Sequence, residues 1–157
     1  MGNATIFYSD TETGISFWQI LKAKNNFLLL KKRNQPEILL FENNKKYSLP
    51  GEKYLISKYN DWLIIWSSTE IWTHTKNEEP ILLNRSGMQL KQVLPLDKYN
   101  TLGLVWEENT TALFPYYLVS HEILDQKINT AVTDSDKRIM YFGGKHNDRD
   151  GLWKLEY

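Results

Sequence analysis

The chain has 157 residues, no cysteine, and 19 basic and 19 acidic side chains that cancel to a net charge of zero. With 41% hydrophobic and 13% aromatic residues, it is too apolar for a disordered chain and long enough to bury a core. The lack of cysteine excludes disulfide scaffolds, thiolate metal sites and thiol nucleophiles, and the balanced charge argues against nucleic acid or a membrane as partner. We therefore expect one domain over residues 1–157.

The first ten residues lack the basic region and the continuous apolar stretch of a secretory signal. No apolar run approaches the roughly 18 residues that are needed to span a bilayer. We therefore expect a cytoplasmic protein.

The hydrophobic pattern has a period of two rather than 3.6, which indicates β-strands. Short runs rich in Ile, Leu, Trp, Tyr and Phe recur, and each is bounded by Asn, Asp, Gly, Pro or Lys. The runs predict strands over residues 5–9, 15–21, 27–32, 37–42, 45–49, 53–57, 62–66, 70–75, 81–84, 89–94, 102–106, 112–119, 138–142 and 151–156.

One stretch, residues 121–132, has helical spacing as well. Leu124, Ile128 and Val132 follow one another at intervals of four, and Ser120 precedes them as an N-cap residue. The same stretch is equally compatible with a strand, so the sequence predicts at most one short helix.

Asn, Gly and Pro residues mark three places where the chain turns, opens a loop or interrupts a strand. Asn43-Asn44 predicts a two-residue hairpin turn, because Asn tolerates positive φ. Gly143-Gly144 predicts the opening of a polar loop before the last strand. Pro115 interrupts the run 112–119, which predicts an edge strand or a bulged one, because proline lacks the N–H that an inner strand needs.

The sequence also contains a faint internal repeat. Its units share a polar turn, an apolar run of about five residues, a polar loop and a second, aromatic strand, and they recur about every 35–40 residues. The units begin near residues 25, 60, 99 and 136, and their second strands contain Phe41, Trp72, Phe114 and Trp153. Runs that are apolar at every position, such as 63–66, suit strands covered on both faces.

These patterns predict an all-β fold of antiparallel, repeated hairpin or sheet units, similar to a small β-propeller of about four blades. A β-sandwich or partly open barrel also fits the strand count, although it favours cleaner in-and-out alternation. A β-trefoil fits the length but requires a threefold repeat.

No catalytic or metal-binding motif stands out. His74, His121 and His146 are too far apart for the common zinc spacings, and the segment 146–151 resembles a calcium loop that has Tyr157 where the bidentate Glu belongs. The paired acids fall in or beside turns, and no nucleophile elbow or phosphate-binding loop is present. We therefore expect a protein that is not an enzyme and needs no cofactor.

The aromatic load, with six Trp and nine Tyr, exceeds what a core of this size needs. Trp62, Trp66, Trp106 and Trp153 lie in apolar runs and predict core positions. Aromatic residues in more polar strands, together with the charged segment near the C-terminus, predict a partner-binding surface. Its candidate residues are Trp18, Trp72, His74, Tyr116, Tyr117, His146, Asp148, Arg149 and Asp150.

A local excess of positive charge lies in the first third of the chain. It suits an acidic protein partner, or edge strands protected by lysine against aggregation. The residues are Lys22, Lys24, Lys31, Lys32, Arg33, Lys45 and Lys46.

The sequence therefore predicts a non-catalytic protein-binding module, such as an inhibitor or immunity protein that occludes a cognate toxin or enzyme. The alternative is a lectin-like domain that uses Trp72, Tyr116 and Tyr117 as platforms for sugar rings. An enzyme built on loop acids and a histidine, or a structural subunit, is a further rival. The oligomeric state and the partner's identity are left open.

Overall fold

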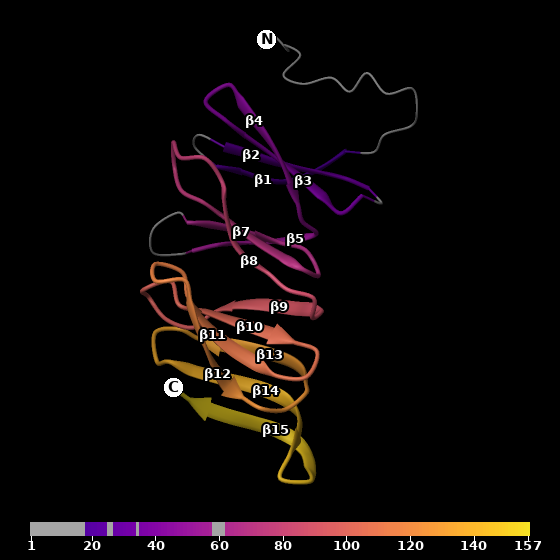
Figure 1. Ribbon diagram of the computed structural model, residues 1–157, viewed down its shortest axis with the longest axis vertical. Helices are drawn as coiled ribbons and strands as arrows, with labels where there is room; N and C mark the ends of the chain where they lie inside the picture. Colours follow the sequence, from indigo (N-terminus) through magenta and orange to yellow (C-terminus); the bar gives the residue numbers. More distant parts are fainter. Residues whose placement is uncertain (1–17, 25–26, 34, 58–61) are drawn as a thin grey trace, which may run out of the picture.

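The computed structural model describes residues 18–24, 27–33, 35–57 and 62–157 (Figure 1). These residues form fifteen β-strands and no helix, which confirms the all-β prediction. The strands are β1 (Trp18–Lys24), β2 (Phe27–Lys32), β3 (Glu37–Glu42), β4 (Lys45–Pro50), β5 (Lys53–Ile56), β6 (Leu63–Trp66), β7 (Glu70–His74), β8 (Ile81–Arg85), β9 (Leu90–Pro95), β10 (Leu102–Trp106), β11 (Thr110–Phe114), β12 (Val119–Leu124), β13 (Ile128–Asp134), β14 (Ile139–His146) and β15 (Arg149–Glu156).

The strands form four antiparallel meanders, each made of consecutive strands. The sheets are β1–β4, β5–β8, β9–β12 and the three-stranded β13–β15. They follow one another along the long axis of the molecule, with β1–β4 at one end and β15 at the other (Figure 1). In the described part of the chain no sheet closes into a barrel and the end sheets do not meet, so a closed propeller ring is not observed.

The sequence repeat corresponds to these sheets. The apolar runs of the four units are β2, β6, β10 and β14, the second strand of each sheet. The aromatic residues of the following runs fall in β3, β7, β11 and β15, the third strand of each sheet. One repeat unit is therefore one sheet.

The core lies between neighbouring sheets, in three layers. Strand β6 shows why its run is apolar at every position: Leu63 and Ile65 pack toward the first sheet, and Ile64 and Trp66 pack toward the third. All four side chains are buried, as expected for a strand covered on both faces. Strand β10 repeats the arrangement and is buried along its whole length.

Two hairpins turn through two consecutive residues with positive φ. Asn43 and Asn44 have φ of 50° and 65° and join β3 to β4, which confirms the predicted turn. Asn147 and Asp148, with φ of 48° and 61°, join β14 to β15 in the same way.

The predicted loop at Gly143-Gly144 is wrong. Both glycines lie inside β14, where they pair with Leu152 and Gly151 of β15. A Cβ on Gly144 would lie 3.1 Å from the carbonyl oxygen of Lys127, so the position is small because the neighbouring backbone passes close to it.

The predicted strand 112–119 is also wrong as one element. Strand β11 ends at Phe114, a turn follows through Pro115, and β12 begins at Val119. β11 is an inner strand, between β10 and β12, so Pro115 terminates it rather than marking an edge.

The helical alternative for residues 121–132 is overturned, because this stretch forms the end of β12 and the start of β13. Leu124 and Ile128 are buried, but Val132 is 62% exposed, so the three do not share one buried stripe. Pairing with β11 and β14 outweighs the local helical spacing.

Two other predictions concern the N-terminal region. The predicted strand 5–9 lies outside the described residues, and of the run 15–21 the structure describes the part from Trp18, where β1 begins.

Within the described ranges, no helix is long and apolar enough to cross a membrane.

Candidate functional site

A groove of about 760 Å³ lies between the second sheet and two loops of the third. One wall comes from Trp62, just before β6, from β7, from β8 and from the loop that joins β7 to β8. The other wall comes from the β9–β10 loop and the β11–β12 turn. The lining residues are Trp62, Thr73, Thr75, Glu78, Glu79, Ile81, Leu83, Tyr99, Asn100, Pro115, Tyr116, Tyr117 and Leu118.

Three tyrosines dominate the mouth of this groove. Tyr116 is 90% exposed, Tyr99 76% and Tyr117 72%, and the apolar Ile81 and Leu118 beside them are also more than half exposed. The rings of Tyr116 and Tyr117 pack edge to face, with their centres 5.1 Å apart. A contiguous exposed apolar cluster of this kind is typical of an interaction site.

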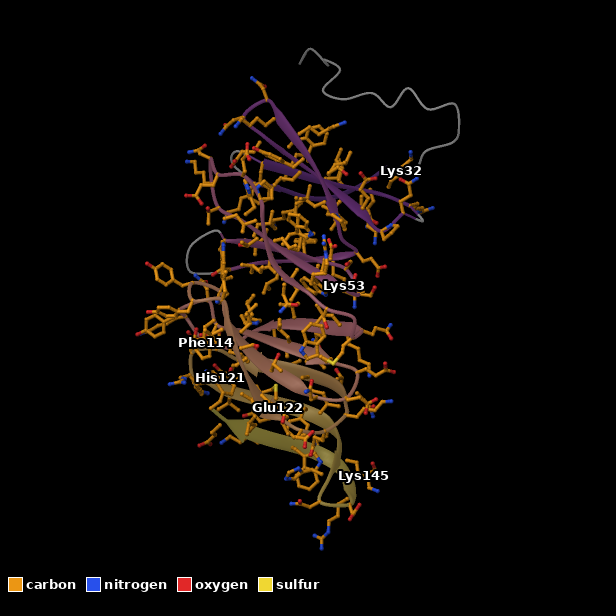
Figure 2. The ribbon with its side chains drawn as sticks, in the orientation of Figure 1. Lys32, Lys53, Phe114, His121, Glu122 and Lys145 are labelled. Carbon is orange, nitrogen blue, oxygen red and sulfur yellow. The ribbon has the colours of Figure 1, made fainter. Side chains whose placement is uncertain are left out.

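The β11–β12 turn is built to hold its two tyrosines outward. The N–H of Tyr117 donates to the carbonyl oxygen of Phe114 at 3.1 Å, and Leu118 closes the turn with a φ of 54°. At the base of the turn, the rings of Phe114 and His121 meet edge to face at 5.8 Å (Figure 2). The turn therefore presents both tyrosines to solvent.

Asp97 organises the loop that carries Tyr99. Its Oδ1 accepts the N–H of Tyr99 at 2.8 Å and that of Thr101 at 3.0 Å, and its Oδ2 accepts the Thr101 hydroxyl at 2.8 Å. Such side-chain bonds to nearby backbone fix a turn. The neighbouring Asn100 accepts a hydrogen bond from Ser57 at 3.1 Å, which ties the loop to the second sheet.

The strand β8 contributes through a bulge. Ile71 pairs with Asn84 and Trp72 pairs with Leu82, so Leu83 is the extra residue of the ladder. A bulge redirects its side chain, and here Leu83 lines the groove beside Ile81.

Among the described residues, two charged side chains line the groove, and both are acidic. They are Glu78 and Glu79, in the β7–β8 loop. The carboxylate of Glu78 accepts a hydrogen bond from the hydroxyl of Thr75, and the N–H of Glu78 donates to the Thr75 carbonyl at 3.1 Å. This rim favours a ligand that carries positive charge next to apolar groups.

The structure places the residues predicted from the sequence in separate regions. Tyr116 and Tyr117 line the groove, whereas Trp72 and His74 lie on the opposite face of β7 from the groove-lining Thr73. Trp72 packs half-buried between the first two sheets, and its indole N–H donates to Glu70 at 3.0 Å. His74 is only 3% exposed, and its Nε2 lies 3.2 Å from Oε2 of Glu42.

The C-terminal candidates form the β14–β15 hairpin, in the sheet at the far end of the molecule. His146 contacts Gln126 through its Nδ1 at 2.6 Å, and its ring lies edge to face against Trp153. Asp148 lies in the turn, 3.3 Å from the ammonium of Lys145, whose place in the hairpin is labelled in Figure 2. Arg149 and Asp150 begin β15 and are exposed.

The segment that resembles a calcium loop is therefore a tight hairpin. Among the described residues, no group of three or more His, Asp or Glu side chains is close enough to hold a metal ion. Trp18, the remaining candidate, begins β1, where its backbone pairs with Lys32.

The basic residues of the first third of the chain belong to the first sheet and its hairpins. Lys32, labelled in Figure 2, lies at the opposite end of the molecule from Lys145 and away from the turn that follows Phe114. Lys31 donates to the carbonyl oxygen of Glu52 at 3.1 Å. These cations do not line the groove.

Sequence reasoning missed Tyr99, Ile81 and the acidic pair of the β7–β8 loop. Tyr99 carried a usable signal, because a tyrosine inside the turn-forming segment Asp97–Asn100 is expected to be exposed. The sequence marks Glu78 and Glu79 only as paired acids beside a turn, and Ile81 carries no signal, because only the stacking of the second sheet on the third brings these residues opposite the tyrosines. Comparison of the sequence with known protein families and with curated proteins finds no match.

Proposed function

We propose that this protein is a non-catalytic protein-binding module that holds a segment of its partner in the groove between β8 and the turn Pro115–Leu118. The observation that carries the proposal is the convergence of Tyr99, Tyr116 and Tyr117, all strongly exposed, on one apolar groove. Tyrosine is enriched among the residues that dominate binding energy at protein interfaces.

The groove also suggests what the partner offers. Its lining is apolar at Ile81 and Leu83, and it carries Glu78 and Glu79. A partner segment with an apolar or aromatic side chain next to Lys or Arg matches both features, because the cation pairs with the rim while the apolar group leaves water.

The finer proposal is that the module inhibits a cognate toxin or enzyme in the cytoplasm. Its support is the sequence, which has no catalytic constellation and a surplus of aromatic residues. An inhibitor needs only a surface that covers an active site, and the hydrogen-bonded β11–β12 turn and Asp97-centred loop are suited to form one.

The test is affinity capture from the native host with folded bait, comparing wild type with the double variant Tyr116→Ala/Tyr117→Ala. We expect wild type to retain one stoichiometric protein that the variant loses. The matched control is Tyr141→Ala, which removes an exposed tyrosine from the sheet at the other end of the molecule. Equal retention by both variants, or no stoichiometric protein with wild-type bait, contradicts the proposal.

Carbohydrate binding is the second candidate, because the exposed tyrosines adjoin groups that can bond hydroxyls, Asn100, Glu78 and Glu79. Trp72 is excluded as a platform for sugar rings, because it is half-buried and hydrogen-bonded to Glu70. Trp62 lines the groove and serves as a fluorescent reporter. Saturable quenching by a glycan selected on an array, abolished by Tyr116→Ala/Tyr117→Ala, favours the sugar over the protein ligand.

A further inference from the structure

Among the described residues, the four sheets have eight edge strands, and seven of them carry a feature that discourages further pairing. Five of them, β1, β8, β9, β12 and β13, contain a one-residue bulge in the ladder. Strand β4 ends in Pro50 and has exposed lysines at its start, and β5 is only four residues long. Bulges, proline, lysine and shortness are the means by which edges avoid pairing with another chain.

Strand β15 also carries an exposed lysine, Lys154, but it has none of the bulges, proline or shortness of the other edge strands. It is the longest edge strand, with eight residues, and it pairs with β14 in one unbroken register from Arg149 to Glu156. It contains no proline and no bulge, and no strand of the described residues pairs with its outer side. It also lies at the end of the molecule, with no other element beyond it in Figure 1, so a second chain has access to it.

The hydrogen bonding of β15 shows which of its backbone groups face outward. The N–H of Tyr157 donates to the carbonyl oxygen of Arg138, and hydrogen-bonded pairs alternate along an antiparallel ladder. The odd-numbered residues of β15 therefore bond to β14. The even-numbered residues, Asp150, Leu152, Lys154 and Glu156, direct their N–H and C=O groups to the open edge.

The side chains of these four residues also share one face of the sheet, and all are exposed, Leu152 to 90%. In an antiparallel pair of two β15 strands centred on Leu152, each Leu152 faces its own copy. On both sides of this centre Asp150 then faces Lys154 of the other copy. Shifting the centre to residue 153 would set Asp150 against Glu156, so charge favours the first arrangement over this one.

We propose that β15 pairs antiparallel with β15 of a second copy of this chain, which joins two three-stranded sheets into one sheet across a twofold axis. The pairing is isologous, as in most symmetric dimers. Leu152 lies at the axis, flanked by two Asp150–Lys154 pairs. Lys154 also contacts Glu156 of its own strand, an exposed contact that leaves the ammonium open to a second acceptor.

The charge pairs give the first test, sedimentation of the full chain over a range of concentrations. We expect wild type to reach the mass of a dimer and Lys154→Asp to weaken dimerisation roughly tenfold or more, because two attractive pairs become repulsive. Asp150→Lys/Lys154→Asp restores both pairs and recovers the dimer. Lys137→Asp, an exposed lysine in the β13–β14 turn, is the matched control and leaves the dimer unchanged.

Because the chain has no cysteine, single cysteines give the register directly. Two copies of residue 152 would lie about 5.5 Å apart between Cα atoms, within the reach of a disulfide. Two copies of residue 150 would lie roughly 13 Å apart along the strands, beyond that reach. We expect Leu152→Cys to cross-link on oxidation, Asp150→Cys to stay monomeric on denaturing gels, and Asp150→Cys/Lys154→Cys to cross-link.

The outcomes separate cleanly. A wild-type mass of one chain at every concentration overturns the proposal. The proposal is also overturned if the protein forms a dimer that Lys154→Asp does not weaken and in which Leu152→Cys does not cross-link. Such a dimer would use another surface. Pairing of β15 with a strand from a different protein, in place of self-association, overturns it as well.

Discussion

Glu42 and His74 form a buried contact that joins the first sheet to the groove. Glu42, at the end of β3, is 5% exposed, and its Oε2 lies 3.2 Å from Nε2 of His74. The same oxygen accepts the N–H of Asn77 at 2.9 Å. Asn77 belongs to the loop that carries Glu78 and Glu79, so one buried carboxylate holds the acidic rim in place.

Replacing Glu42 by Ala should therefore destabilise the protein. The change leaves the Asn77 N–H without its acceptor and His74 without the neighbouring carboxylate, and we expect the free energy of unfolding to fall by about 1–3 kcal/mol. Urea unfolding followed by tryptophan fluorescence measures this. Glu79→Ala, an exposed residue of the same loop, should change stability far less, and equal losses from the two variants would contradict the role given to Glu42.

Tyr157 gives the protein a pH dependence on the alkaline side. Its hydroxyl donates to the carbonyl oxygen of Leu96 at 2.5 Å, and burial, followed by the nearby charge of Asp97, raises its pKa to about 12. An unfolded tyrosine titrates near 10. Its contribution to stability is therefore complete below about pH 10 and disappears as the pH rises through about 12.

In Tyr157→Phe this part of the pH dependence should be missing. We expect the free energy of unfolding of wild type to fall more steeply than that of the variant between about pH 10 and pH 12. The comparison cancels the titration of the lysines and the other tyrosines. Parallel pH profiles would show that the environment of Tyr157 does not act in this way.

At the scale of elements, the hairpin turns show how local chemistry selects strand register. The β3–β4 and β14–β15 hairpins each use two consecutive residues of positive φ, drawn from Asn and Asp, the side chains that tolerate this conformation best after glycine. Such turns match the twist of the strands that they join.

Asn44→Val should test this dependence at an exposed position. A β-branched residue at φ of 65° is strained, so we expect a loss of about 1–2 kcal/mol in the free energy of unfolding, whereas Asn44→Gly should retain wild-type stability. Thermal or urea unfolding of both variants gives the answer. A valine variant as stable as the glycine variant would mean that the turn adapts its backbone.

Several strands could be predicted closely because their signals are local. The run 102–106 became β10 with the same bounds, and the repeat located the second and third strands of each sheet. The failures share a cause, because the structure at each place is set by a neighbouring element. The pairing of β11 with β12 ends at Pro115, and the backbone of Lys127 passes close to Gly144. Residues 121–132 form strands because they pair with β11 and β14.

At the scale of the whole molecule, the four sheets stack in a row, so the inner sheets are covered on two faces and the end sheets on one. The second and third sheets have a neighbour on both sides, and the core layers on both sides bury β6 and β10 completely. The first and last sheets each pack against one neighbour among the described residues. In such arrays, stability depends on the interfaces between adjacent units.

Hydrogen exchange should follow this order. We expect the amides of β6 and β10 to exchange most slowly and those of β1 and β15 most rapidly, because local opening needs to break one interface at the ends and two in the middle. Hydrogen exchange should be measured on the variant Lys154→Asp, because pairing of β15 between two copies would otherwise add protection to that strand. Uniform protection across all four sheets would indicate a single cooperative unit instead.

The candidate site was only partly accessible to prediction. The exposure of Tyr116 and Tyr117 follows from a proline-broken strand, and the burial of Trp66 and Trp106 follows from their apolar runs. The dispersal of the other candidates could not be foreseen, because His74 is buried by the first sheet and the hairpin of Asp148 lies in the last.

The order of the residues was enough to predict most of the strands, the repeated sheet unit and the Asn43-Asn44 turn, since period-two alternation, apolar runs and Asn-rich turns each act within a few residues of one chain. The groove arises only when the sheets stack, and the edge of β15 is open because no further strand of the described residues pairs with it. Packing of one sheet face on the next joins residues that are far apart in the chain, such as Glu79 and Tyr116, and depends on the shape and coverage of whole faces rather than on any neighbouring residue.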